Sequence, residues 1–359
     1  MRVLYLSNYH NPYRDEFFEQ LGRKCDLTVL FEQRVEASRD VSWFEGVSAG
    51  SYKEIYLPEE EHGPISPTMM KVIDEGWSFV VVGCYNSPKQ MVAISHLRRQ
   101  RIPYFVNSDG PLFETRGIKG LIRRRVLRGA DAYLVAGSAS VPSVRREIGR
   151  SSMIVPYPFS SLTQTRIDKL AIMREDRNRQ RILLVGQFLP YKGIDLALDA
   201  LAGLSNDLQI RLVGTGSRSH EAEKFAASRG MQNVEVVPFL EPDALVKEYL
   251  RAGIFVLPSR QECWGLVINE AASCGCPIVS TWGSGAAVEF LSRHYPHYLA
   301  EPGNVGSLAG AISRLLSASV SELISYGDAL RRIAANYTIE SMVETHLRAF
   351  ERMLGDVCD

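Results

Sequence analysis

The chain has 359 residues, of which 45% are apolar and 23% charged, and its 41 basic residues balance 41 acidic ones. These fractions are those of an ordinary globular protein and argue against a disordered or fibrous chain. The length favours two domains that each bury a core. The net charge of zero gives no reason to expect nucleic acid as a partner.

The cysteines and the amino terminus indicate the compartment. Six cysteines are scattered without a Cys-x-x-Cys pair, which argues against a disulfide scaffold or structural zinc. The first apolar run is too short for a signal peptide, and no run approaches the roughly 20 apolar residues of a membrane span. We therefore expect a cytoplasmic protein with reduced thiols.

Short apolar runs alternate with amphipathic stretches along the chain. The runs of the first half are 3–7, 27–31, 79–83, 104–106, 132–136 and 153–155. After a polar break at 156–180, the series restarts with 182–185, 210–213, 234–237, 254–257 and 278–280. Continuous Val, Ile and Leu runs are typical of parallel strands buried on both faces. The pattern predicts an α/β fold with two Rossmann-like domains, residues 1–165 and 170–339, whose ligands bind at the carboxyl ends of strands and often between domains.

Several common motifs are missing from the sequence. No GxGxxG follows a predicted strand, and Gly214 and Gly216 form only a GxG fragment, which argues against a nicotinamide dehydrogenase. A GxxxxGK[ST] motif is also absent, which excludes a P-loop NTPase. There is no DxD pair to hold a divalent cation on a diphosphate, so we expect neither a metal nor another cofactor.

The segment GQFLPYKG (186–193) follows a predicted strand and opens an apolar helix. Lys192 is unusual there, because that helix end is already positive. A bound anion would resolve the conflict, with backbone N–H groups and the ammonium forming a phosphate site. The alternative is a solvated surface lysine.

A second segment, PSRQECWGLVINEA (258–271), follows another predicted strand. Glu262 lies in the loop, and Glu270 lies inside the helix that Gly265 or Leu266 begins. The first turn of that helix offers unpaired N–H groups to a diphosphate or a sugar hydroxyl. Glu270 has apolar neighbours and needs hydrogen-bond donors, such as a ribose diol. The alternative is an N-cap glutamate and a surface glutamate.

The pattern ECWGLVINE resembles the signature of retaining GT-B glycosyltransferases of the group 1 type (family 4). GQFLPYKGIDLALDAL, LVGTGS, VPFL, IFVLPS and EAASCGCPIVST occur in the family's order over residues 180–285. The first half resembles the family more loosely, through NYHNPYRDEFFEQL and NSDG. The resemblance implies the GT-B fold, with the active site in the cleft between the domains, the donor on the C-terminal domain and the final helix, 340–359, packed on the N-terminal one.

The resemblance also implies roles for individual residues. Glu262 would contact hydroxyls of the donor sugar, Glu270 would hold the ribose, and Lys192 would neutralise the diphosphate as it leaves. The remaining donor-binding candidates are Gly186, Gln187, Gly214, Gly216 and the backbone of Trp264, Gly265, Leu266 and Val267.

Two features depart from the family pattern. Gln187 stands where many members carry an arginine, so a charge is lost, and Arg260 or Arg14 are candidates to replace it. The loop at 10–14 lacks the Gly-Gly that many members have close to the donor phosphates.

On the acceptor side, Asp109 follows a predicted strand and is positioned to orient an acceptor hydroxyl. The alternative is a turn aspartate within Ser-Asp-Gly-Pro, and His10 is a weaker candidate. Residues 116–128 combine six basic residues with Ile118, Leu121, Ile122 and Val126 on the other side at helical spacing. Such a segment lies either on an anionic membrane or against the core with a solvated basic face.

Together these features predict a metal-independent retaining glycosyltransferase. It would move a hexosyl group from a nucleotide-diphospho-sugar to a glycan or lipid-linked acceptor in bacterial-type polysaccharide or glycoconjugate assembly. Its predicted location is the cytoplasm, with a peripheral position on the inner face of the membrane as a further option. An epimerase, a phosphorylase or a non-catalytic nucleotide-sugar sensor of the same fold remains an alternative. The sequence indicates neither the base and sugar nor the linkage and oligomeric state.

Overall fold

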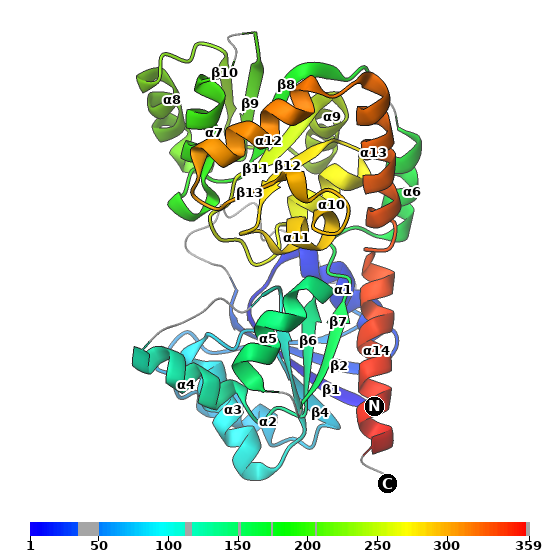
Figure 1. Ribbon diagram of the computed structural model, residues 1–359. Helices are drawn as coiled ribbons and strands as arrows, with labels where there is room; N and C mark the ends of the chain where they lie inside the picture. Colours follow the sequence, from blue (N-terminus) through cyan, green and yellow to red (C-terminus); the bar gives the residue numbers. More distant parts are fainter. Residues whose placement is uncertain (35–49, 112–116, 150–151, 174, 205–206, 357–359) are drawn as a thin grey trace. The chain divides into compact units, whose positions relative to one another are not determined.

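A computed structural model describes residues 1–34, 50–111, 117–149, 152–173, 175–204 and 207–356 (Figure 1). The chain divides into two compact units. The first comprises Met1–Ser161 and Ile339–Asp359, and the second comprises Leu162–Thr338.

In the described part of the first unit, seven parallel strands form one sheet in the order β3-β2-β1-β4-β5-β6-β7. The strands are β1 (Arg2–Tyr9), β2 (Asp26–Gln33), β3 (Lys53–Tyr56), β4 (Phe79–Val82), β5 (Tyr104–Ser108), β6 (Ala132–Ala136) and β7 (Met153–Tyr157). The helices are α1 (Pro12–Gly22), α2 (Pro67–Ile73), α3 (Pro88–Gln100), α4 (Gly117–Leu127), α5 (Val141–Ile148) and α14 (Ile339–Asp356).

The strands of this sheet are apolar on both faces because helices cover both. On one face, Phe79 of β4 contacts Phe350 of α14 at a ring distance of 4.6 Å, and Tyr5 of β1 contacts Phe18 of α1 at 5.0 Å. On the other face, Val80 and its neighbours join a core to which α2, α3 and α5 contribute. The C-terminal helix is therefore part of the first unit (Figure 1).

In the described part of the second unit, six parallel strands form a sheet in the order β10-β9-β8-β11-β12-β13. The strands are β8 (Asn178–Val185), β9 (Gln209–Val213), β10 (Val234–Val237), β11 (Ala252–Leu257), β12 (Ile278–Thr281) and β13 (Leu299–Ala300). The helices are α6 (Gln164–Ile172), α7 (Ile194–Ala202), α8 (Ser219–Ser228), α9 (Pro242–Arg251), α10 (Leu266–Ser273), α11 (Gly285–Leu291), α12 (Val305–Ser317) and α13 (Val320–Ala334). The predicted fold class, with two Rossmann-like α/β units, is confirmed.

Each sheet has one point where the strand order reverses. In the first sheet β1 lies beside β4, and in the second β8 lies beside β11. The connections that follow the two strands of each pair run to opposite sides, which leaves a crevice beyond their carboxyl ends. Ligands of open α/β sheets bind in this crevice, so the loops after β1, β4, β8 and β11 are where each unit's site is expected.

Helix α4 corrects one expectation. Ile118, Leu121 and Ile122 are exposed by 76%, 65% and 50%, whereas Val126 packs against the core. The predicted separation of one apolar and one basic side is therefore wrong, and so is the alternative in which all four apolar residues face the core. Arg116, also predicted in this segment, lies outside the described residues. No helix in the described ranges combines the length and apolar character needed to span a bilayer.

Candidate active site

Lys192 and Glu262 meet at the strand-order reversal of the second sheet. Lys192 ends the turn that follows β8, and Glu262 lies in the loop that follows β11. Their ammonium and carboxylate groups form an ion pair, with side chains exposed by 23% and 15%. The two candidates come together because β8 and β11 are neighbours in space although 70 residues separate the side chains along the chain.

The loops that carry this pair are fixed by close backbone contacts. Gly193 has a φ of +68°, and a Cβ atom there would lie 2.2 Å from the carbonyl oxygen of Pro258. Only glycine allows the two loops to approach so closely. The N–H of Glu262 donates to the Gly283 carbonyl at 2.8 Å, and the N–H of Arg260 donates to the Tyr191 carbonyl at 2.8 Å. The loop with Glu262 is thus held between the loops that follow β8 and β12.

Helix α10 begins directly beside the pair. Gly265 is its N-cap at a φ of +93°, and a Cβ there would lie 3.0 Å from the Leu257 side chain. Leu266 and Val267 form the first turn, where backbone N–H groups lack partners within the helix and the helix dipole is positive. This helix end can receive an anion.

The side chain of Trp264 is buried in the core. It is 2% exposed, its Nε1 donates to Asn269 at 3.0 Å, and its ring stacks on Tyr337. Its carbonyl oxygen accepts hydrogen bonds from Ser284 and from the N–H of Ala286. The carbonyl oxygen of Trp264, one of the predicted backbone contacts, is therefore engaged within the protein.

Glu270 is a half-buried carboxylate on α10. It accepts a hydrogen bond from the hydroxyl of Tyr249 on α9, at 2.9 Å. Burial raises the pKa of Glu270 to about 7, against the opposing effects of Tyr249 and the charge of Arg166. Tyr249 thus supplies this carboxylate with one hydrogen-bond donor.

The glycine candidates gather at the ends of β8 and β9. The N–H of Gly186 donates to Val213, and a Cβ at Gly214 would lie 3.6 Å from the Gly186 nitrogen. Gly214 and Gly216 both have positive φ angles, +86° and +56°. Gln187 is exposed beside them. The chain is free of side-chain bulk here, so a ligand can approach the backbone.

The proposed substitutes for the missing arginine have other partners. Arg260 donates to both carboxylate oxygens of Asp195, at 2.8 and 2.6 Å, and to the Pro190 carbonyl at 2.5 Å. This pairing lowers the pKa of Asp195 despite its partial burial. Arg14 lies in the first unit, where its side chain is only 4% exposed and pairs with Asp109.

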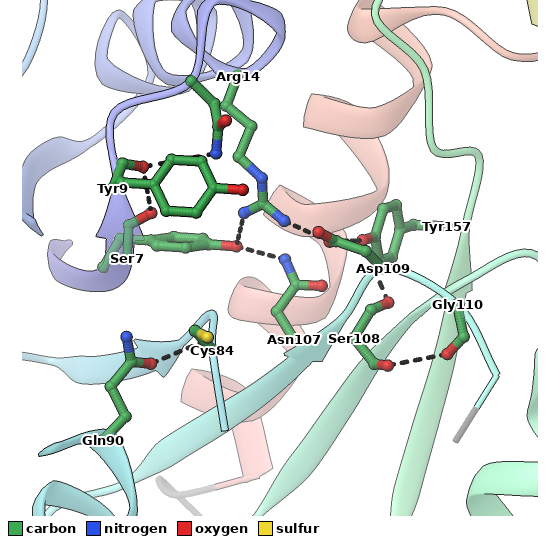
Figure 2. A network of polar contacts seen from close by, with 12 residues as sticks. Ser7, Tyr9, Arg14, Cys84, Gln90, Asn107, Ser108, Asp109, Gly110 and Tyr157 are labelled. Atoms are coloured by element: carbon green, nitrogen blue, oxygen red, sulfur yellow. Dashed lines mark hydrogen bonds and ion pairs between the residues drawn. The ribbon is translucent and has the colours of Figure 1, made fainter. Parts of the chain in front are cut away.

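Asp109 is the centre of a polar network at the carboxyl ends of the first sheet's strands (Figure 2). Arg14 of α1 points toward it and also donates to the Tyr5 hydroxyl at 2.9 Å. The Tyr157 hydroxyl donates to the Asp109 carboxylate at 3.3 Å. The Asp109 side chain is 31% exposed, so a ligand can still reach it. In the predicted Ser-Asp-Gly-Pro turn, the hydroxyl of Ser108, and not the Asp109 carboxylate, donates to the Gly110 carbonyl.

A small cavity of about 100 Å³ opens beside this network at the β1–β4 reversal. Its lining is mostly polar and includes Ser7, Asn8, Tyr9, Asn11, Arg14, Gly83, Cys84 and Asp109. Asn11 is 3% exposed, and its Oδ1 accepts no hydrogen bond within the described residues. His10 instead pairs with Asp15 at 2.8 Å, and a hydrogen bond to that carboxylate raises the pKa of His10.

Comparison with known proteins identifies a family that the second unit matches. Residues 166–334 match the family Glycosyl transferases group 1. The matched residues lie within the second unit. The match covers Lys192, Glu262 and Glu270, and therefore the strand-order reversal at which the first two meet.

Curated relatives of the group 1 domain align over part of their length. The chain is 33% identical to the D-inositol 3-phosphate glycosyltransferase of Acidothermus cellulolyticus over 148 residues, which cover 38% of this chain and 33% of that protein. It is 29% identical to an uncharacterised glycosyltransferase of Methanocaldococcus jannaschii over 38% of each chain. The chain thus spans about a third of the length of these relatives.

Solved structures match the chain from end to end. Sucrose-phosphate synthase of Thermosynechococcus elongatus has a TM-score of 0.74 and 17% identity, over 99% of this chain and 100% of that one. Anabaena HepE in complex with UDP-glucose has a TM-score of 0.73 and 14% identity, with the same coverage. These similarities show that the chain has the GT-B fold, with two parallel-sheet α/β domains.

Sequence reasoning about the group 1 domain missed the residues that hold its candidates in place. Ser284 contacts the residues at the start of α10. Tyr249 bonds to Glu270, and Gly193 allows the close approach of the Lys192 loop to Pro258. The position of Gly193 directly after Lys192 in the motif is a sequence signal for its role, whereas no sequence signal marks Tyr249 or Ser284. In the described residues, no three His, Cys, Asp or Glu side chains are grouped so that they could hold a metal ion.

Proposed function

We propose that the protein is a retaining glycosyltransferase. It moves a sugar from a nucleotide-diphospho-sugar to a hydroxyl of a glycan or glycolipid acceptor without a metal ion, in polysaccharide or glycoconjugate assembly. The observation that carries this proposal is the Lys192–Glu262 pair at the β8–β11 reversal, within residues that match the group 1 family.

Lys192 stabilises the leaving group in this mechanism. Negative charge grows on the nucleoside diphosphate as the glycosidic bond breaks, and a fixed cation lowers the energy of that charge most in the transition state. Glu262 engages the ammonium through Oε2, which holds it in place and leaves Oε1 as the atom that we assign to the donor sugar's hydroxyls. The backbone N–H groups at the start of α10 complete the diphosphate site.

Glu270 binds the ribose of the donor. A half-buried carboxylate with a raised pKa gains when two hydroxyl donors reach it, and a ribose diol offers both. The Tyr249 hydroxyl orients the carboxylate from the other side. The glycines at the ends of β8 and β9 let the nucleotide lie against the backbone.

Asp109 orients the acceptor hydroxyl in the first unit. Arg14 and Tyr157 fix its carboxylate, and the small polar cavity beside it accommodates a hydroxyl-bearing group. We assign no metal to either unit. We place the protein at the inner face of the cell membrane, for which the surface of α4 is the reason.

A donor screen followed by a turnover assay tests the proposal. The chain is heated with UDP-, GDP- and ADP-sugars, because a ligand that binds only the folded state raises the melting temperature. UDP-glucose comes first, since HepE was solved with it. Release of free nucleotide supports transfer, a changed sugar supports an epimerase, and binding without turnover supports a sensor.

Variants assign the chemistry to the pair. Lys192→Ala is expected to lower turnover about a hundredfold or more, as does the loss of one transition-state contact in other enzymes, and Glu262→Ala is expected to abolish transfer. Lys224→Ala, an exposed lysine of the same unit, is the matched control. Equal activity of Lys192→Ala and Lys224→Ala would overturn the assignment. Activity after chelation with EDTA and the anomeric configuration of the product, read by NMR, test metal independence and retention.

A further inference from the structure

We propose that the outer face of α4 docks on the surface of an anionic phospholipid bilayer. This outer face consists of Ile118, Leu121, Ile122 and Arg125. Their spacing is i, i+3, i+4 and i+7, so they form one stripe along the helix. The three apolar side chains are exposed by 76%, 65% and 50%, and Arg125 is exposed as well.

The inner side of α4 fixes this orientation. Leu127 is 1% exposed and belongs to the core, which Val126 also contacts. Arg123 and Arg124 pair with Glu147 of α5 at 3.3 and 3.0 Å, and they lower the pKa of that carboxyl despite its burial. The apolar stripe therefore points outward because the opposite side of the helix is held by packing and by a buried ion pair.

The surroundings of α4 are strongly basic. Exposed arginines at the end of α3 and on α5 flank it: Arg98, Arg99, Arg101, Arg145 and Arg146. The Arg98 guanidinium donates to the carbonyl of Arg125 at 3.2 Å, which places the end of α3 beside α4 (Figure 1). Glu147 is the one acidic residue in the sequences of α3, α4 and α5, and two arginines already neutralise it.

This combination fits a membrane surface better than another polyanion. Arginine heads stay with anionic headgroups while neighbouring apolar side chains enter the acyl boundary. Three exposed branched aliphatic residues gain nothing from a nucleic acid. Membrane binding by α4 can be tested without turnover. Its consequence, that the acceptor is lipid-linked, rests on the proposed function.

Cosedimentation with vesicles tests the inference. The full chain is mixed at low salt with vesicles of phosphatidylcholine alone, or of equal parts phosphatidylcholine and phosphatidylglycerol. We expect binding to the anionic vesicles only, and a decrease in binding as salt is added. Absence of binding to anionic vesicles at low salt overturns the proposal.

Two sets of variants separate the apolar from the charged contribution. Arg125→Glu is expected to weaken binding by about fivefold or more, since each basic residue near an anionic surface contributes about fivefold. The triple change to serine at 118, 121 and 122 is expected to weaken it by about tenfold or more, because apolar burial is lost. The substituted side chains are exposed, so melting temperatures should stay within a few degrees.

Controls of the same type come from the second unit. Ile172→Ser with Ile324→Ser changes two exposed isoleucines, and Lys224→Glu with Lys247→Glu reverses two exposed charges. Both control pairs should bind vesicles like the unchanged chain, and an equal loss in either overturns the assignment to α4. If the triple serine variant binds normally, the surface is a general polyanion site and the membrane proposal is wrong. Nucleotide release with a water-soluble acceptor tests the glycosyltransferase separately, since no α4 variant should affect it.

Discussion

Glu270→Gln should stabilise the protein at neutral and alkaline pH while weakening its affinity for the donor nucleotide. Burial raises the pKa of Glu270 from the ordinary 4.5 to about 7. The ionised form is therefore costly in the folded protein. Glutamine keeps an oxygen that can accept the Tyr249 hydrogen bond, has nearly the same shape, and carries no charge.

The sign and the size of the effect follow from proton binding. Between pH 4.5 and about 7 the folded state binds more protons at Glu270 than the unfolded state does. The contribution of Glu270 to stability is therefore fully present below pH 4.5 and is lost as the pH rises through 7. The pKa difference corresponds to roughly 3 kcal/mol, and because the residue is only half-buried we expect about 1–3 kcal/mol for the variant at pH 8.

Urea unfolding of both proteins at pH 5, 7 and 8.5 measures this effect. The gap in unfolding free energy should widen with pH in favour of Glu270→Gln. Glu289→Gln is the matched control, because Glu289 also accepts a tyrosine hydroxyl, from Tyr337 at 2.7 Å, and the change reports the effect of replacing a carboxylate by an amide at such a contact. A gap for Glu270→Gln that stays constant with pH would refute the reasoning. In parallel, nucleoside diphosphate should bind the variant at least tenfold more weakly, because an ionised carboxylate is the stronger acceptor for ribose hydroxyls.

Three further predictions concern single residues. Asp109→Asn leaves the Arg14 guanidinium in a nearly buried place without its counter-charge, so we expect a loss of about 2 kcal/mol in urea unfolding, below the full value for a buried pair because Asp109 is partly exposed; unchanged stability would contradict the network. Gly193→Ala should lower stability by roughly 3 kcal/mol or more and displace the Lys192 loop, since its Cβ would lie 2.2 Å from a carbonyl oxygen, whereas Gly216→Ala, with open space around it, should lose only about 1 kcal/mol for its positive φ. His346 is fully buried, which lowers its pKa to about 4, so stability should fall as the pH drops from 6.5 to 4, and a His346→Leu chain should lack this part of the pH dependence.

The fold was predictable where strands are buried on both faces. Each of the predicted apolar runs lies in a strand, and the ends of run and strand differ by a few residues. The edge strands β3 and β13 were not predicted. β3 has only partly buried residues, Lys53–Tyr56, and β13 has two residues, so neither produces the continuous apolar run that marks a central parallel strand.

The candidate site was predictable as a set of chemical groups. Lys192 and Glu262 were singled out from different strand loops, and the strand order explains why they meet. The network around Asp109 was not predictable, because Tyr5, Arg14 and Tyr157 are scattered along the sequence and their contact depends on three neighbouring elements. A buried tyrosine in an apolar strand has no sequence signal that separates a core role from a polar one.

Helix α4 shows where periodicity is insufficient. A helical repeat places Ile118, Leu121 and Ile122 on one side, but it does not say which side the protein core covers. Packing of Leu127 and the ion pairs with Glu147 decide that, and both depend on α5, which lies more than ten residues further along the chain. The ordinary assumption that apolar residues face inward therefore fails at this helix.

Under the proposed function, Lys192 is the cation that we assign to the diphosphate, and no arginine is assigned to it. Gln187 carries no charge. Both terminal nitrogens of the Arg260 guanidinium donate to the Asp195 carboxylate, and one of them also donates to the Pro190 carbonyl. A diphosphate that reaches Lys192 must therefore compete with Glu262 for the ammonium. In the proposed mechanism this competition favours catalysis, because Glu262 would satisfy the lysine while the donor binds, and the growing charge of the leaving group would outweigh the carboxylate only as the bond breaks. Stabilisation that strengthens toward the transition state raises turnover rather than ground-state affinity.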